Sequence, residues 1–238
     1  MWASLRVALV VGGLGIPAAL IGIPWSMLQG NVNAMYGWAM WIIRLGLRAG
    51  GIRVHIVGRE NVPSEPCIVM SNHVSNLDPP VLLPCVPGMT SVLLKQELMR
   101  IPLLGTAMRL GRFVPVARGH SREEATRSIA AAREALRHGL HITIFPEGTR
   151  SPDGQLLPFR KGGFFLAAET GTPVIPVVIR GTERLMRRGS SRLQAGAVTV
   201  HFLPALQPRA YASREALMSA VREAMQRELE RSGAPSGL

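Results

Sequence analysis

A histidine and an aspartate five residues apart are the first residues of this chain that could carry out chemistry. They are His73 and Asp78, in the segment 72–80 with the sequence NHVSNLDPP. A carboxylate beside an imidazole suits a general base, because it holds the ring in one tautomer and stabilises the protonated form. The alternative is structural: His73 ends a strand and Asp78 caps a helix, as most such pairs do. Other segments must decide between the two.

A second polar segment, residues 146–151 with the sequence PEGTRS, follows an apolar run. Gly148 permits close approach of the backbone to a ligand. Exposed backbone amides, the Thr149 hydroxyl and the Arg150 guanidinium could together hold a phosphate, and Glu147 could accept hydrogen bonds from a polyol. The alternative is a polar turn with a Glu147–Arg150 ion pair, which would contribute little.

Composition narrows the class of partner. The 238 residues carry a net charge of +12, and the only lysines are Lys95 and Lys161, so arginine supplies most of the positive charge. Arginine favours bidentate contact with phosphate, which suggests nucleic acid, an acidic lipid surface or a phosphorylated substrate. Aromatic residues make up 5% of the chain and are not interleaved with basic ones, which argues against a single-strand nucleic-acid platform.

The cysteines predict neither a metal site nor a disulfide framework. Cys67 and Cys85 lack the spacing of metal ligands, and two cysteines do not form a scaffold. We expect reduced thiols in a cytosolic environment. No motif calls for a metal or another cofactor.

The amino-terminal part of the chain is apolar, with no charged residue over 7–43. A polar turn near residue 30 divides it into segments 7–28 and 34–47. The first is long enough to span a bilayer, which takes about 20 residues. The second is short and suits the headgroup boundary, with aromatic residues Tyr36, Trp38 and Trp41. We expect a membrane anchor over 1–50. The alternatives are a cleaved signal peptide, which the thin charged start and continued apolarity oppose, and a buried core helix.

Short apolar runs then alternate with helical stretches, which indicates a layered α/β domain. Pro115 suggests an edge strand or a bulge. We expect this domain over 51–232, followed by a flexible tail over 233–238. Strands are predicted over 52–57, 66–71, 92–94, 113–116, 141–145, 174–179 and 198–203, and helices over 76–84, 97–110, 121–138, 160–170 and 213–231.

Four segments in this order resemble the glycerolipid acyltransferases typified by 1-acyl-sn-glycerol-3-phosphate acyltransferase. The first family motif is Asn-His, four residues and Asp, which Asn72, His73 and Asp78 match. The third motif matches FPEGTRS. The second is the loosest and the fourth is marked by Pro176. The segments are 72–78, 95–105 with 113–118, 145–151 and 174–179, and the resemblance covers roughly residues 52–205.

The resemblance implies a domain with a mixed, largely parallel sheet, and a role for each motif. His73 would act as general base, oriented by Asp78, so that the acceptor hydroxyl attacks the acyl thioester directly and no acyl-enzyme forms. Backbone amides near 72–75 are candidates for stabilising the oxyanion. The residues expected to bind substrate are Asn72, Lys95, Arg118, Glu147, Gly148, Thr149 and Arg150.

The expected activity is acyl transfer from acyl-CoA or acyl carrier protein to lysophosphatidic acid, which gives phosphatidic acid. We expect a protein of the inner membrane with its active site on the cytoplasmic face, and no nucleic-acid partner. Two alternatives stay open: another lysolipid acceptor, such as a lyso-ornithine lipid, and an inactive membrane lipid-binding protein. A basic nucleic-acid-binding domain is opposed by the apolar amino-terminal part and by the lack of a binding motif.

Overall fold

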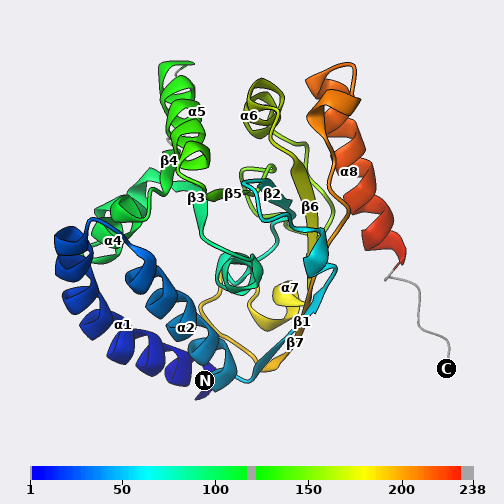
Figure 1. Ribbon diagram of the computed structural model, residues 1–238. Coiled ribbons are helices and arrows are strands. Elements are labelled where there is room, and N and C mark those ends of the chain that lie inside the picture. Colours follow the sequence, from blue (N-terminus) through cyan, green and yellow to red (C-terminus); the bar gives the residue numbers. More distant parts are fainter. Residues whose placement is uncertain (1, 117–121, 232–238) are drawn as a thin grey trace.

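Seven strands form one sheet in the described part of the chain, residues 2–116 and 122–231 of a computed structural model (Figure 1). They are β1 Ile52–Val57, β2 Ile68–Ser71, β3 Thr90–Lys95, β4 Val114–Val116, β5 His141–Ile144, β6 Val174–Arg180 and β7 Gly196–Phe202. Their order across the sheet is β1-β7-β6-β2-β5-β3-β4. Neighbours from β6 to β4 are parallel, β7 is antiparallel to β6, and β1 is parallel to β7. The predicted mixed, largely parallel sheet is confirmed.

Helices cover both faces of this sheet, which explains why its central strands are apolar throughout. Ile68 and Met70 of β2 belong to a core with α5, α6 and α8, whereas Val69 points to the opposite core with α2, α3 and α7. The expected layered α/β architecture is therefore present. These helices are α2 Asn33–Ala49, α3 Asp78–Leu82, α5 Arg122–Arg137, α6 Gly162–Thr170, α7 Thr182–Leu185 and α8 Arg214–Arg231.

The amino-terminal helices form an antiparallel hairpin beside the sheet (Figure 1). Helix α1, Trp2–Gln29, packs on α2 through small residues: a Cβ placed at Gly46 would lie 3.0 Å from Val11, and one at Gly50 would lie 2.8 Å from Val7. Helix α1 is long and apolar enough to cross a membrane, with a mean hydropathy of 2.1 in a window that is only 11% buried. Its outer face thus displays apolar side chains that the protein itself does not cover.

The predicted helix over 97–110 is interrupted. A 3₁₀-helix, η3 Gln96–Arg100, is followed by α4 Leu104–Leu110. Pro102 disfavours helical geometry in the preceding residue, and Ile101 is extended with ψ 121°. Leu103 has φ 61°, so the chain reverses before α4 begins. The sequence pattern therefore predicted one continuous helix where residues 101–103 separate two short ones.

Other sequence predictions vary in accuracy. Strand β4, which contains Pro115, lies at the edge of the sheet as predicted. The predicted helix over 76–84 is shorter, since α3 ends at Leu82 and a 3₁₀-helix, η2 Leu83–Cys85, follows it. Helix α7 was not predicted. The expected tail over 233–238 lies outside the described residues. The remaining 3₁₀-helices are η1 Arg59–Asn61 and η4 Pro208–Ala210.

Candidate active site

Most of the motif residues lie at the carboxyl edge of the parallel strands. His73 follows β2, the segment 145–151 follows β5, Lys95 ends β3, and Thr182 follows β6. These strands are neighbours in the order β6-β2-β5-β3 and run in the same direction. Their carboxyl ends therefore meet along one edge, which is where open α/β sheets bind their ligands.

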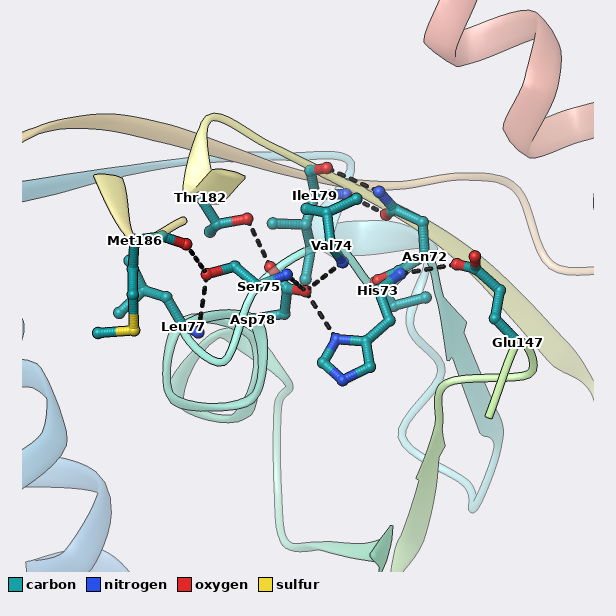
Figure 2. A network of polar contacts seen from close by, with 11 residues as sticks. Asn72, His73, Val74, Ser75, Leu77, Asp78, Glu147, Ile179, Thr182 and Met186 are labelled. Atoms are coloured by element: carbon teal, nitrogen blue, oxygen red, sulfur yellow. Dashed lines mark hydrogen bonds and ion pairs between the residues drawn. The ribbon is translucent and has the colours of Figure 1, made fainter. Parts of the chain in front are cut away.

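His73 and Asp78 form the pair that the sequence predicted (Figure 2). The Nδ1 atom of His73 lies 2.8 Å from the Asp78 Oδ2 atom, and the two side chains are 18% and 0% exposed. A carboxylate only accepts hydrogen bonds, so Nδ1 carries the hydrogen and Nε2 is the basic nitrogen. The imidazole also lies against the Phe145 ring, with a centroid distance of 4.4 Å. Both contacts fix the plane of the imidazole.

The buried Asp78 carboxylate is surrounded by donors. Its Oδ2 atom accepts the backbone N–H groups of Val74, at 2.7 Å, and Ser75, at 2.8 Å, while Oδ1 accepts the Thr182 hydroxyl. Burying a charge is costly unless it is hydrogen-bonded, and these donors meet that need. Sequence reasoning missed Thr182, which lies 104 residues from Asp78; its only signal was a polar residue just past a parallel strand.

The expected oxyanion donors are already used. The N–H of His73 binds Glu147, and those of Val74 and Ser75 bind Asp78 (Figure 2). An N–H that points at a carboxylate is not available to a developing oxyanion. The expectation that amides near 72–75 stabilise the oxyanion is therefore wrong for these three groups, because each of them already donates to the Glu147 or the Asp78 carboxylate.

Asn72 connects the loop to the neighbouring strand. Its side-chain amide donates to the Ile179 carbonyl at 2.9 Å, and its side-chain oxygen accepts the Ile179 N–H at 2.7 Å. The residue is 2% exposed. Both polar groups of the side chain are thus engaged with backbone, which favours a positioning role over the predicted contact with substrate.

Glu147 also points inward rather than toward solvent. Its Oε1 atom accepts the His73 N–H at 2.8 Å, and its Oε2 atom accepts the Leu157 N–H at 2.9 Å. Burial raises the pKa of Glu147, and the two N–H groups act in the opposite direction. A second link between the two motifs is the bond from the Ser151 N–H to the His73 carbonyl, at 2.7 Å. Glu147 therefore joins the two motifs, in place of the polyol contact that the sequence suggested.

Arg222 of helix α8 holds the backbone segment that binds Glu147. Its guanidinium donates to the Leu157 carbonyl at 2.6 Å and to the Leu156 carbonyl at 2.7 Å, and it lies over the Phe159 ring. The N–H of the same Leu157 binds Glu147. A continuous chain of contacts thus runs from α8 to His73. Sequence reasoning gave Arg222 no role.

The remaining candidates are on the surface of this edge. Gly148 has φ +68°, and a Cβ there would lie 2.4 Å from the Arg160 side chain, so glycine is required. Thr149 and Lys95 are exposed and Arg150 is half-exposed; within the described residues Arg150 has no ion pair or side-chain hydrogen bond. Arg118 lies outside the described residues.

No group of three or more potential metal ligands is found among the His, Cys, Asp and Glu residues that the structure describes. The site contains a histidine with a carboxylate partner, exposed cationic side chains, and the backbone around Gly148. This set of groups suits the transfer of a proton from a hydroxyl beside an anionic substrate.

Comparison with known proteins identifies a family model and several relatives that match this chain. A family model described as Acyltransferase matches residues 53–180. The 1-acyl-sn-glycerol-3-phosphate acyltransferase of Pseudomonas aeruginosa is 32% identical over 180 residues, 74% of this chain and 68% of that protein. The protein of the same name from Limnanthes alba is 31% identical over 182 residues, 76% of this chain. The match spans 64% of the Limnanthes alba protein and 40% of a chloroplastic relative from Brassica napus.

A solved structure agrees over nearly the whole chain. The crystal structure of the 1-acyl-sn-glycerophosphate (LPA) acyltransferase PlsC from Thermotoga maritima has a TM-score of 0.81 and 28% identity. The superposition covers 99% of this chain and 97% of that one. The similarity therefore includes the amino-terminal hairpin as well as the α/β domain.

Proposed function

The chain belongs to the acyltransferase family, and we propose that it transfers a fatty acyl group from an acyl thioester to the sn-2 hydroxyl of 1-acyl-sn-glycerol 3-phosphate. The product would be phosphatidic acid. The observation that carries the proposal is the His73–Asp78 pair, in which Nδ1 is held by a buried carboxylate and Nε2 lies on the outer side of the ring. The relatives named for this activity support the choice of acceptor.

The reaction needs no covalent intermediate on the protein. The hydroxyl oxygen attacks the thioester carbonyl carbon while Nε2 of His73 accepts the hydroxyl proton. The tetrahedral intermediate then collapses, the carbon–sulfur bond breaks, and the imidazolium returns the proton to the leaving sulfur. Asp78 stabilises the imidazolium throughout. A positioned base of this kind contributes typically about 10²–10⁴-fold to the rate.

Cations at the same edge would hold the acceptor phosphate. Arg150 is half-exposed and has no carboxylate partner within the described residues, so its guanidinium is available for bidentate contact. Lys95 adds positive charge from the end of β3, and the exposed segment at Gly148 and Thr149 offers backbone and hydroxyl donors. Arg118 is assigned to the same phosphate only by the family motif. The donor would be acyl-CoA or acyl carrier protein.

The amino-terminal hairpin would seat the domain on a bilayer, where a lysolipid acceptor resides. The outer face of α1 exposes large apolar side chains, including Trp25 at 51% and Leu28 at 81%. Burying such a face in the headgroup and acyl boundary is favourable. We place the protein at the inner membrane with its active site on the cytoplasmic face, and we expect no nucleic-acid partner.

The decisive experiment measures acyl transfer from labelled acyl-CoA to lysophosphatidic acid by purified protein in lipid vesicles. Wild type should form phosphatidic acid, and His73→Ala should lose about 10²–10⁴-fold in turnover while it keeps its circular dichroism spectrum. A folded His73→Ala variant with normal turnover would remove His73 as the base. Acyl carrier protein and other lysolipids, including a lyso-ornithine lipid, form the rest of the panel. Absence of product from every pair would favour an inactive lipid-binding protein.

Arg150→Ala tests the phosphate site separately. We expect the apparent KM for lysophosphatidic acid to rise, because a charge-assisted pair contributes about 1.5–3 kcal/mol, or roughly 10- to 100-fold. The KM for the acyl donor should stay unchanged. An unaltered KM for the acceptor would place its phosphate elsewhere.

A further inference from the structure

The loop between α7 and β7 gathers positive charge outside the motifs of the site. Four arginines fall within nine residues of this part of the chain, and Glu183 is the one acidic residue among 182–195. Arg184 pairs with Glu183 at 3.5 Å on the surface. Among the residues that the structure describes, the other three form no ion pair with a carboxylate. They are Arg187, Arg188 and Arg192.

This loop has a defined backbone. The Gln194 N–H donates to the Leu185 carbonyl at 2.8 Å and closes its base. Within it the Ser190 N–H donates to the Arg187 carbonyl at 3.0 Å, and the Ser190 hydroxyl accepts the Arg192 N–H at 3.0 Å. These bonds fold the loop back on itself, so the arginines are presented from a fixed turn.

The turn surrounds an open cavity of about 250 Å³. Pockets for drug-sized ligands are about 300–1,000 Å³, so this one suits a small anionic group rather than a whole cofactor. Guanidinium forks and a hydroxyl are the groups that bind phosphate oxygens. The lining residues are Arg184, Leu185, Arg187, Ser190, Arg192 and Gln194.

The same loop is fastened to the amino-terminal end of α1. The Ser4 hydroxyl donates to the Ser191 carbonyl at 3.4 Å and accepts the Leu193 N–H at 2.8 Å. Close by on α1, Trp2 is 74% exposed and Leu9 is 65% exposed. An exposed indole and apolar helix face beside arginines is the pattern of the boundary between acyl chains and headgroups.

We propose that this arginine-lined cavity binds the phosphate of an anionic bilayer lipid and holds the amino-terminal end of α1 at the headgroup level. The proposal rests on the membrane association given above, and adds a site distinct from the one that holds the acceptor. Continuity with the apolar face of α1 points to a lipid of the bilayer rather than a soluble phosphate compound. Each arginine near an anionic surface strengthens binding about fivefold, the equivalent of about 1 kcal/mol.

The test is vesicle co-sedimentation of the full chain at constant ionic strength, with phosphatidylcholine alone or mixed with phosphatidylglycerol. Arg187→Gln/Arg192→Gln should bind mixed vesicles roughly 25-fold more weakly than wild type, and phosphatidylcholine vesicles equally well. The matched control is Arg137→Gln/Arg227→Gln, which removes two exposed arginines from α5 and α8, away from α1 in Figure 1. It should bind like wild type.

Three results would overturn the proposal: unchanged binding of the loop variant, equal weakening of the control, or release of the protein by inorganic phosphate or free CoA. The first would mean that the loop arginines do not contact the lipid, the second that they act as ordinary surface charge, and the third that the cavity holds a soluble anion. The acyl-transfer assay separates this proposal from the proposed function. If transfer occurs but the loop variant binds normally, only the cavity assignment fails. If the loop variant binds vesicles more weakly but wild type shows no acyl transfer, only the proposed function fails.

Discussion

A histidine lies beside a polar side chain near each end of strand β2, and we propose a catalytic role only for the histidine at the carboxyl end. At the carboxyl end, His73 Nδ1 lies 2.8 Å from the Asp78 carboxylate. At the amino end, His141 Nδ1 lies 3.1 Å from the Cys67 sulfur and 3.2 Å from the Cys67 backbone nitrogen. Only the four buried residues 68–71 and the start of the His73 loop separate the two pairs.

Burial and charge explain the difference. His141 is 3% exposed and Cys67 is 0% exposed. Burial lowers the pKa of His141 and raises the pKa of Cys67 to about 12, so both groups stay uncharged and pack as neutral side chains. Asp78 is equally buried, but four donors stabilise its charge, and its histidine is partly exposed. The proposed role of His73 as base therefore rests on a hydrogen-bonded carboxylate that holds its Nδ1 atom and on a side chain that is 18% exposed.

The largest effect is expected from Asp78→Asn. The side-chain oxygen would keep the Oδ2 position, where three N–H groups converge, and the amide would face the Thr182 hydroxyl, which can rotate to accept. The fold should survive while the charge is lost. Turnover should fall on the order of 10²–10⁴-fold in the acyl-transfer assay. A folded variant with near-normal turnover would mean that the carboxylate only shapes the loop.

Thr182→Val should have a smaller effect, because it removes one donor and leaves the charge. A hydrogen bond to a charged group contributes about 1.5–3 kcal/mol, so turnover should fall roughly 10- to 100-fold at the upper limit. Thr182→Ser, which keeps the hydroxyl, should restore turnover. Failure of serine to restore it would indicate a packing effect.

Arg222 should affect His73 at a distance, through Leu157 and Glu147. Arg222→Gln would lose at least one of its two carbonyl contacts, each typically worth about 0.5–1.5 kcal/mol. We expect turnover to fall about 3- to 10-fold with little change in the KM for the acyl donor. Arg227→Gln, five residues along the same helix and exposed, is the control and should behave like wild type. Equal losses in both variants would remove the link from α8 to the base.

The Cys67–His141 pair should affect stability and leave turnover unchanged. Because the pKa of His141 is lower in the folded than in the unfolded chain, the unfolded chain binds more protons as the pH falls below about 6.5. Stability should therefore be full above that pH and decrease below it, by at most about 1.4 kcal/mol per pH unit.

His141→Asn provides the measurement for that pair, since its side-chain oxygen can accept the Cys67 N–H but it does not titrate. Denaturant unfolding at a series of pH values should show a shallower acid decline than wild type. Turnover per folded molecule should be the same in both proteins. A large loss of turnover at His141→Asn would contradict the assignment of catalysis to only one end of β2.

Local sequence patterns determined a large part of this protein. Short apolar runs located the strands, and their alternation with helical stretches predicted a layered α/β domain. An uncharged stretch interrupted by a polar turn predicted two amino-terminal helices. The five-residue spacing of His73 and Asp78 predicted a contact that is present, because a short loop keeps the two residues close together. Where Pro102 interrupted a helical pattern, local periodicity alone gave too long a helix.

Tertiary structure decided the partners of these polar groups that lie far away in the sequence. Asn72 binds Ile179, Asp78 binds Thr182, and Glu147 binds His73, across 107, 104 and 74 residues of sequence. These partners meet only because β6, β2 and β5 are adjacent and parallel, so that their carboxyl ends share one edge. Residue types along the chain give the hydrogen-bonding capacity of each group. The strand order decides which of those groups are used within the fold and which remain for a substrate.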